Sequence, residues 1–327
     1  MSQLSKTRAS EILRTLPERK VLVLGDVMLD EFVWGDVTRI SPEGPVPVVD
    51  VRRESVHLGG AANVLANLIS LGAHGWVVGV VGSDFAGERL REQLRQLNSG
   101  DEVGLIVDET RPSTTKTRIV AHSQLVVRAD RESRAPVNEK TEAQIIAHLK
   151  EKLAEAHAFV VSDYDKGVVT PNILREILPF AYERVPVLID PKLRNFNSYR
   201  PATLVTPNHL EALRMSDTED HSDDGSHEAA RIIQQKLGCD AVLITRGDRG
   251  MMLLEAGGQP VYVKTAAREV YDVTGAGDTV IATLAAALAS GATMVEAAAL
   301  ANHAAGIVVG KVGTATATTA ELIATFE

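Results

Sequence analysis

The chain has 327 residues and contains 34 Lys and Arg against 43 Asp and Glu, which gives a formal net charge of −9. A general nucleic-acid binder needs a basic face toward the phosphate backbone, so this charge argues against that class and leaves open only a local basic pocket. With 45% hydrophobic and 24% charged residues, the composition is typical of a globular protein and excludes a disordered one.

The cysteine content and the apolar runs limit the cellular compartments in which such a protein is expected. Cys239 is the only cysteine, which excludes an intramolecular disulfide, and it is predicted to be a small buried apolar residue. The first 20 residues lack the apolar core of a signal peptide and are typical of a short amphipathic helix. The longest apolar run, 280–289, is shorter than the ~20 residues that span a bilayer. We therefore expect a cytoplasmic protein without a membrane segment.

Short apolar runs rich in β-branched residues alternate with helical patterns along the chain. Strands are predicted at 21–24, 76–81, 103–107, 159–161, 185–189, 203–205 and 241–245. Helices are predicted at 61–71, 87–97, 139–156, 171–182 and 226–237. Strands that are apolar on both faces and alternate with helices favour a mostly parallel sheet covered on both sides. The predicted fold is therefore a doubly wound α/β fold.

Two stretches, 32–58 and 109–130, interrupt this pattern. Apolar and polar residues alternate there, as in half-exposed strands. We predict that they form a small antiparallel β lid, inserted into an α/β domain made of 1–31, 59–108 and 131–327.

The acidic segment 216–227 has to be tested as a calcium loop. Counted from Asp220, Gly225 takes the glycine position, but the twelfth residue is Arg231 where a bidentate Glu is required. The segment is therefore predicted to be a solvated loop.

The strongest chemical signal is the segment 272–279, DVTGAGDT. Gly275 and Gly277 free the backbone directly before an apolar helix predicted from Asp278 to residue 289, and amides at a helix N-terminus attract anions. A carboxylate beside a phosphate is unfavourable for binding alone, because like charges repel. It is useful if Asp278 orients a hydroxyl and takes its proton during phosphoryl transfer. The alternative is an ordinary helix cap.

Two glycines and two carboxylates near the N-terminus form a second candidate region. Gly59 and Gly60 open a helix and would admit a ligand close to the backbone, or form a simple turn. Asp26 and Asp30 follow the first predicted strand, at the sheet edge where α/β proteins bind ligands. Asp30 would suit sugar hydroxyls, and the alternative is a loop carboxylate or a helix cap.

Two more segments follow predicted strands and belong at the same edge. Asn208 and Glu211 could hold the water shell of Mg²⁺, or simply begin a helix. Thr245 ends the predicted strand 241–245, and Gly247 follows it. The chain contains no HExxH, GxSxG or Walker motif, so metalloprotease, esterase and P-loop functions have no support.

Together these residues resemble the ribokinase-like (PfkB) family of carbohydrate and nucleoside kinases, through Gly59-Gly60 and DVTGAGDT. Within the family the chain is most similar to the heptose 7-phosphate kinases. The segments that carry this similarity are GDVMLDEFVWGDVTRISPEGPVPV at 25–48, SDYDKG at 162–167, DPK at 190–192, TPNHLE at 206–211 and ANHAAGIVVGKVGTAT at 301–316.

The resemblance implies that ATP phosphorylates the anomeric hydroxyl of D-glycero-β-D-manno-heptose 7-phosphate to the 1,7-bisphosphate, for ADP-heptose and lipopolysaccharide core synthesis. The alternatives are a PfkB kinase for fructose 6-phosphate or ribose, and a non-catalytic sugar- or nucleotide-binding regulator. ATP and Mg²⁺ are the implied cofactors, and a requirement for a monovalent cation such as K⁺ stays open. Since the chain ends at Glu327 without an HxGH-type motif, we expect a separate phosphatase and nucleotidyltransferase to act downstream.

The same resemblance assigns roles to individual residues. Asp278 is implied to be the catalytic base, with an anion hole formed by the amides of Gly275, Ala276 and Gly277. Asn208 and Glu211 would position Mg-ATP. The other residues implied to contact the nucleotide are Thr245 and Gly247 along its length, and Asn302 and His303 near the adenine.

The acceptor sugar and its phosphate complete the implied site. The implied sugar contacts are Asp30, Gly59, Gly60 and Asn63. Charge and placement alone suggest three cations that neutralise phosphate charge, namely Arg118, Lys166 and Lys192. In this family similar lids close over the sugar and in some members pair between subunits, so a homodimer through the lid is expected.

Overall fold

The computed structural model describes residues 4–97, 104–122, 124–267 and 269–326. In this part of the chain one large sheet has the strand order β13-β12-β11-β10-β9-β8-β1-β4-β5. Its strands are β1 (Lys20–Gly25), β4 (His74–Val81), β5 (Gly104–Val107), β8 (Ala158–Ser162), β9 (Val187–Asp190), β10 (Leu204–Val205), β11 (Ala241–Thr245), β12 (Met251–Glu255) and β13 (Val261–Val263).

All neighbouring strands from β5 to β11 run parallel, which confirms the predicted sheet. Two strands that were not predicted, β12 and β13, extend it in antiparallel fashion. The first residue of the strand predicted at 103–107, Val103, lies outside the described residues.

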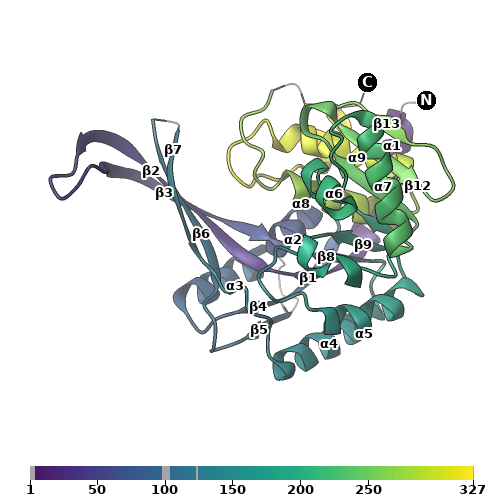
Figure 1. Ribbon diagram of the computed structural model, residues 1–327, viewed down its shortest axis with the longest axis horizontal. Coiled ribbons are helices and arrows are strands. Elements are labelled where there is room, and N and C mark those ends of the chain that lie inside the picture. Colours follow the sequence, from purple (N-terminus) through teal and green to yellow (C-terminus); the bar gives the residue numbers. More distant parts are fainter. Residues whose placement is uncertain (1–3, 98–103, 123, 268, 327) are drawn as a thin grey trace.

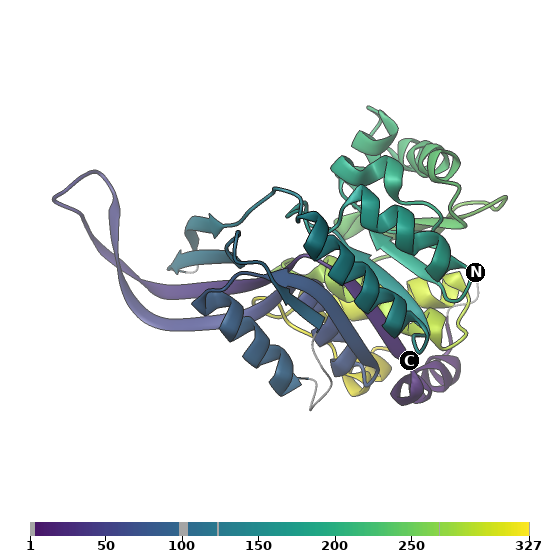
Figure 2. The ribbon, with the colours of Figure 1, turned by 90° about the horizontal axis from the view of Figure 1, so that it is seen from below.

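Helices cover both faces of this sheet, as expected for a doubly wound fold (Figures 1 and 2). One face carries α1 (Lys6–Arg14), α2 (Ala61–Ser70), α3 (Phe85–Leu97), α8 (Ala276–Ala289), α9 (Met294–Val308) and α10 (Thr319–Ala324). The other carries α4 (Glu139–Leu153), α5 (Pro171–Tyr182), α6 (His209–Ser216) and α7 (Asp223–Leu237). Short 3-10 turns lie at Leu16–Glu18, Leu193–Ser198 and Gly247–Arg249.

Strand β1 shows how the sequence builds both layers of the core. Val21 and Val23 pack into the first helical layer, whereas Leu22 and Leu24 pack into the second, and all four are fully buried. Side chains alternate between the faces of a strand, so a strand covered on both sides must be apolar throughout.

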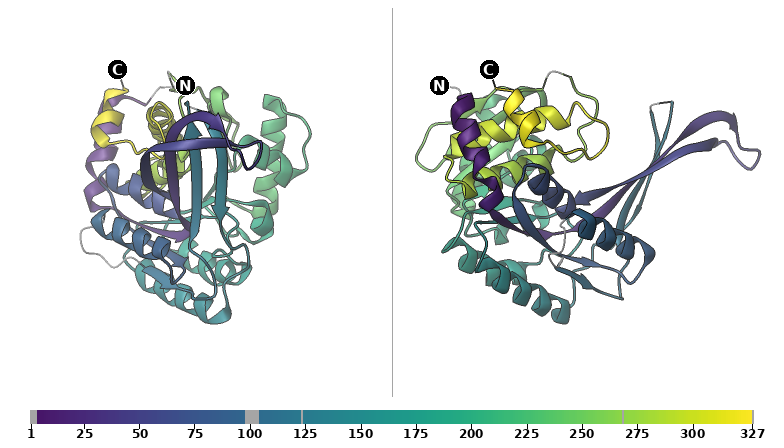
Figure 3. Two further views of the ribbon diagram at one scale, coloured as in Figure 1. Left: turned by 90° about the vertical axis from the view of Figure 1, so that its left-hand side faces the viewer. Right: turned by 180° about the vertical axis from the view of Figure 1, so that it is seen from behind.

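A second, smaller sheet projects from the core (Figures 1 and 3). This β lid consists of β2 (Val27–Ile40), β3 (Pro47–Gly60), β6 (Thr114–Ala121) and β7 (Gln124–Arg131), in the order β3-β2-β6-β7. The prediction of antiparallel pairing is right for β2–β3 and β6–β7 but wrong for β2–β6, which pair in parallel. The chain leaves the core after β1 to form β2 and again after β5 to form β6, so both strands run outward.

The acidic segment 216–227 is only partly the loop that was predicted. Helix α7 already begins at Asp223, where the Ser222 side chain accepts a hydrogen bond from the Gly225 amide at 3.2 Å. Asp223 and Asp224 lie in its first turn, where the helix dipole stabilises negative charge. Acidity near a helix N-terminus therefore favours the helix rather than a loop.

Two smaller predictions can be compared with the structure. Cys239 is 3% exposed and packs in the core beneath α7, as predicted. The N-terminal helix is α1, which buries Ala9, Ile12 and Leu13. Among the described residues, no helix has the length and apolar character needed to cross a membrane.

Candidate active site

The carboxyl ends of the parallel strands bring several polar side chains to one edge of the large sheet. Asp26 follows β1, Tyr164 follows β8 and Asp190 ends β9. Asn208 follows β10 and forms an isolated bridge to Thr245, the last residue of β11. This is the edge at which open α/β sheets bind ligands.

Helix α8 begins at this edge with free amides. Its N-cap is Gly275, which has the left-handed conformation with φ = +78°. Because glycine has no side chain, no side chain caps the helix. Among the described α-helices, only α2 and α8 begin at a glycine without a side-chain cap. The amides of Gly275, Gly277 and Asp278 have no partner among the described residues, whereas the Ala276 amide donates to the Val273 carbonyl oxygen at 3.2 Å. Ala276 was predicted to join the anion hole, but its amide is occupied here.

Asp278 lies in the first turn of α8 and is only 2% exposed. Its Oδ2 accepts a hydrogen bond from Asn63 Nδ2, and its Oδ1 accepts one from the Tyr164 hydroxyl, both at 2.8 Å. Burial raises the pKa of Asp278 to about 6, and the negative charge of Asp30 acts in the same direction. The two hydrogen bonds oppose this rise, and a carboxyl group with this pKa is mostly ionised at neutral pH.

A chain of buried amides and hydroxyls fixes Asn63 behind the carboxylate. Asn67 Nδ2 donates to the Asn63 carbonyl oxygen at 2.9 Å and to Asn63 Oδ1 at 3.2 Å. The Thr279 hydroxyl, next to Asp278 in the chain, donates to Asn67 Oδ1 at 2.8 Å. Helices α2 and α8 are thereby joined through side chains, and Asn63, which was predicted to contact sugar, holds the carboxylate of Asp278.

Tyr164 is held from the other side by Asp26. The Asp26 carboxylate accepts backbone N–H bonds from Tyr164 at 2.8 Å, and from Lys166 and Val168 at 3.1 Å. Burial raises the pKa of Asp26 to about 6, although these three donors oppose the rise. Asp26 therefore shapes the loop that places the Tyr164 hydroxyl on Asp278.

Asp30 and the two glycines join the β lid to this edge. Asp30 is 4% exposed and pairs with Arg118 of β6. A Cβ atom on Gly59 would lie well under 3.0 Å from Asp30 Oδ2, and one on Gly60, whose φ is +57°, would collide with the Asp26 carbonyl oxygen. Both glycines are thus required by close backbone packing around the two aspartates.

The predicted nucleotide residues Asn208 and Glu211 form a capping box at the start of α6. Asn208 Oδ1 accepts from the Glu211 amide at 2.9 Å, and Glu211 Oε2 accepts from the Asn208 amide at 3.0 Å. Glu211 also pairs with Lys192, which follows β9. The helix-start interpretation is confirmed, and it places an exposed amide and a carboxylate beside Thr245 at the sheet edge.

Three other residues predicted to contact the nucleotide, Gly247, Asn302 and His303, lie in surroundings that differ from one another. Gly247 is exposed, with φ = +60°, just beyond β11. Asn302 is 5% exposed and donates to the Lys264 carbonyl oxygen at 2.7 Å, which ties the segment after β13 to α9. His303 faces away from Asn302, toward Thr325 and Phe326 near the C-terminus. The structure does not bring the His303 side chain together with the other predicted nucleotide residues.

Three features of the site were missed in the sequence: the Tyr164 hydroxyl, the carboxylate of Asp190 and the ammonium of Lys116. Tyr164 and Asp190 belong to the segments SDYDKG and DPK, so the signal was present but no role was attached to it. Burial raises the pKa of Asp190 to about 8, partly opposed by Lys192. Lys166, which was suggested to neutralise phosphate charge together with Arg118 and Lys192, pairs with Glu132 at 2.7 Å.

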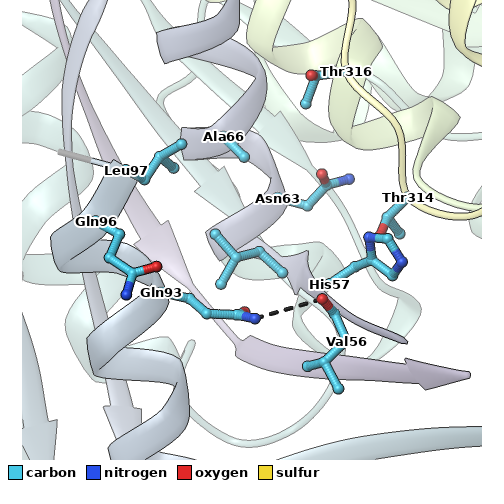
Figure 4. A pocket seen from close by; sticks show the side chains of 10 residues that line it. Val56, His57, Asn63, Ala66, Gln93, Gln96, Leu97, Thr314 and Thr316 are labelled. Atoms are coloured by element: carbon cyan, nitrogen blue, oxygen red, sulfur yellow. Dashed lines mark hydrogen bonds between the residues drawn. The ribbon is translucent and has the colours of Figure 1, made fainter. Parts of the chain in front are cut away.

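A pocket of about 370 Å³ adjoins the site on the far side of Asn63 (Figure 4). It lies between the inner end of β3, helices α2 and α3, and the loop that carries Thr314 and Thr316. The side chains of Asn63, His57 and Thr314 approach one another at its wall (Figure 4). The pocket therefore lies beside the base of the lid and beside Asn63, which bonds Asp278.

Few side chains in the described part of this site are free to bind a metal ion directly. Within the described residues, no group of three or more His, Cys, Asp or Glu side chains is arranged to hold a metal ion. Asn208 is exposed, whereas both Glu211 oxygens already accept bonds. This donor set fits a Mg²⁺ ion that keeps its waters and arrives with phosphate oxygens.

A buried carboxylate behind unpaired helix amides, on a ribokinase-like fold with a β lid, is the arrangement of a phosphoryl-transfer enzyme that acts on a hydroxyl. Residues 18–321 match the model of the pfkB family carbohydrate kinases. The chain belongs to this family and is a carbohydrate kinase, which confirms the resemblance seen in the sequence.

Two curated relatives are bifunctional proteins named HldE. The protein from Paramagnetospirillum magneticum is 48% identical over 306 residues, which cover 93% of this chain and 62% of that protein. The protein from Pelobacter propionicus is 45% identical over 303 residues, which cover 92% and 62%. The chain thus spans about 62% of the length of these relatives.

Solved structures support the fold. Phosphofructokinase-2 from Escherichia coli, in complex with substrates and products, has a TM-score of 0.78 at 18% identity, over 93% of this chain and 97% of that chain. Ribokinase from Arabidopsis thaliana, complexed with ribose and ATP, has a TM-score of 0.73 at 17% identity, over 94% and 98%. At these identities the likeness shows the architecture alone.

Proposed function

We propose that this chain transfers the γ-phosphoryl group of ATP to the anomeric hydroxyl of D-glycero-β-D-manno-heptose 7-phosphate, for ADP-heptose and lipopolysaccharide core synthesis. The observation that carries the phosphoryl-transfer step is the buried Asp278 carboxylate directly behind the free amides of Gly275 and Gly277. The choice of acceptor is supported by the motifs similar to heptose 7-phosphate kinases, and by HldE relatives that are 48% and 42% identical.

In the proposed reaction Asp278 orients the acceptor hydroxyl and receives its proton. The hydroxyl oxygen forms a bond to the γ-phosphorus, the bond from that phosphorus to the β–γ bridging oxygen breaks, and ADP leaves with the electron pair. A loose phosphoryl-transfer transition state needs orientation more than early deprotonation, so a carboxylate suffices as a late base. The hydrogen bonds from Asn63 and Tyr164 fix the carboxylate for this role.

Other groups supply charge stabilisation and binding in this proposal. The amides of Gly275 and Gly277 and the α8 dipole stabilise the transferred phosphoryl oxygens. Asp30 accepts hydrogen bonds from sugar hydroxyls beneath the lid. Mg²⁺ bound to ATP neutralises phosphate charge, and its water shell meets Asn208 and Glu211 at the start of α6.

We also propose that two copies pair through the β lid. The described lid strands and their connecting turn expose apolar side chains that a monomer would leave in water: Ile40, Val46, Val51, Leu125, Val126 and Val127. Light scattering at assay concentration should give twice the chain mass, and the double change Leu125→Asp with Val127→Asp should give the mass of one chain. A wild-type monomer would contradict the pairing.

The test of the reaction is ADP release with Mg-ATP across four acceptors: the heptose 7-phosphate, fructose 6-phosphate, ribose and adenosine. Asp278→Asn serves as the catalytic control. Turnover of the heptose phosphate alone, lost in the variant, is the expected result. Turnover of another acceptor with the heptose phosphate inert would refute the substrate, and silence with all four would favour a non-catalytic binding protein.

A further inference from the structure

The site face of the β lid carries a row of charged side chains beside Asp278. In the strand register, Asp30 of β2 lies opposite His57 of β3 and Lys116 of β6, and Lys116 lies opposite Asp130 of β7. Residues in register point to the same face of a sheet. Lys116 and Asp30 both act electrostatically on Asp278, which places this row against the catalytic carboxylate.

Lys116 differs from the other cations of the site because no carboxylate neutralises it. Arg118 pairs with Asp30, Lys166 with Glu132, and Lys192 with Glu211. Among the described residues no carboxylate oxygen lies within the 4.0 Å of an ion pair from Lys116 Nζ. Its neighbour across the lid, Asp130, is taken by Arg128 at 2.9 Å.

The contact that Lys116 does make directs it into the site. Its Nζ lies 5.2 Å from the centroid of the Tyr164 ring, whose hydroxyl donates to Asp278. Lys192 lies 5.6 Å from the same ring but comes from the nucleotide end of the large sheet. Two cations thus lie near the Tyr164 ring: Lys192, which pairs with Glu211, and Lys116 of the lid, which forms no ion pair with the described residues.

A half-buried ammonium without an anion is costly unless a ligand supplies the charge. Burial lowers the pKa of Lys116, with Lys166 and Arg118 acting in the same direction and Asp30 opposing it. Asp30 and Asp278 attract Lys116 only from beyond the distance of an ion pair, so a neutral sugar would leave its ammonium group without a direct anionic partner. An acceptor that already carries a phosphate would neutralise it.

We propose that Lys116 is the residue that selects a phosphorylated sugar as acceptor, by binding the phosphate that the acceptor already carries. The inference rests on the proposed kinase reaction but not on which sugar is the substrate. It assigns the phosphate to a cation that was not among the three suggested by the sequence, all of which are already paired.

The experiment compares kcat/KM for each sugar phosphate with that for the same sugar without its phosphate, using heptose 7-phosphate with heptose and fructose 6-phosphate with fructose. In Lys116→Met the preference for the phosphorylated member should fall by roughly 10- to 100-fold, the effect of one hydrogen bond to a charged group. The change should appear in the KM of the sugar phosphate and leave the KM of ATP unaltered. Lys116→Arg, which keeps the charge, should retain most of the preference.

The matched control is Lys20→Met. Lys20 Nζ also lies 5.2 Å from an aromatic ring, that of Trp76, but it pairs with Glu155 and lies at the opposite end of β1. Its removal should leave the preference unchanged, and circular dichroism should show both methionine variants folded.

The outcomes separate this inference from the proposed function. If the wild type uses the fructose pair and not the heptose pair, the substrate proposal fails while Lys116 can still account for the preference. An equal loss for both members of a pair in Lys116→Met would assign the residue to the transferred phosphoryl group and overturn the inference. A wild type that prefers unphosphorylated sugars would also overturn it, and a wild type inactive on both pairs would refute the two proposals together.

Discussion

The catalytic edge and the β lid differ in how deeply their side chains are buried and how firmly they are held. At the edge, Asp278 is 2% exposed and both its oxygens accept hydrogen bonds from side chains that are themselves held by others. In the lid, β7 is exposed along its whole length, and its neighbour β6 is half-buried in its middle and buried at both ends. Phosphoryl transfer requires fixed geometry, whereas closing over a sugar requires a surface that can adjust. We therefore propose that the buried edge carries the chemistry and that the exposed lid recognises the acceptor.

The largest effect is expected when the Asp278 carboxylate is removed. Asp278→Asn keeps the shape of the side chain but cannot accept a proton, so kcat should fall on the order of 10³-fold, within the range of general base catalysis. ATP affinity, measured by calorimetry, should stay nearly unchanged because the amides of Gly275 and Gly277 remain. If nucleotide binding disappears together with activity, Asp278 is a structural residue.

The junction between the two regions is tested by Gly59→Ala. The added Cβ would lie 2.9 Å from Met28 Cγ and closer still to Asp30 Oδ2, so Asp30 and its pairing with Arg118 must shift. The acceptor KM should rise by about 10- to 100-fold, the effect of losing charge-assisted hydrogen bonds, while the KM of ATP stays constant. Gly44→Ala at the lid tip, where a Cβ meets nothing within 4 Å, is the matched control. Equal kinetics for the two variants would show that Asp30 does not bind the acceptor.

The same division explains how far the sequence could be interpreted. Apolar runs such as Val21–Leu24 predict the parallel sheet because both faces of each strand must be buried. Gly275 and Gly277 before an apolar helix predict free amides at its N-terminus. Local patterns of this kind are complete within a few residues, so the buried edge was largely predictable.

Pairings between distant residues were not predictable in this way. The parallel pairing of β2 with β6 depends on where the chain re-enters the lid, some 74 residues after β2. The bond from Tyr164 to Asp278 joins residues 114 positions apart. The unpaired Lys116 likewise follows from tertiary placement, since sequence shows a cation but not whether a carboxylate reaches it.

A smaller effect is expected when one support of the carboxylate is removed. Protonated Asp278 cannot accept a proton, so kcat/KM should fall as the pH decreases through about 6, the pKa of Asp278. The Tyr164 hydroxyl stabilises the charged form, so Tyr164→Phe should raise that pKa and move the acid limb of the profile upward by about half to one pH unit. Tyr182→Phe, on the surface near Asp240, is the control. An unshifted acid limb would mean that another group limits activity at low pH.

The last effect concerns the stability of the two regions. Burial raises the pKa of Asp278 from 3.8 to about 6 in the folded state, so the folded protein holds the proton more tightly than the unfolded chain. The stability associated with that proton is complete below pH 3.8 and is lost as the pH rises through 6. Asp278→Asn avoids the buried charge, so its free energy of unfolding at pH 8 should exceed that of the wild type by about 1–3 kcal/mol, with little difference near pH 4.

Asp30→Asn in the lid should act in the opposite direction at pH 8, because it leaves Arg118 without its carboxylate. Urea unfolding at the two pH values measures both, and a destabilised Asp278→Asn at pH 8 would show that the hydrogen bonds from Asn63 and Tyr164 outweigh the cost of burying the charge.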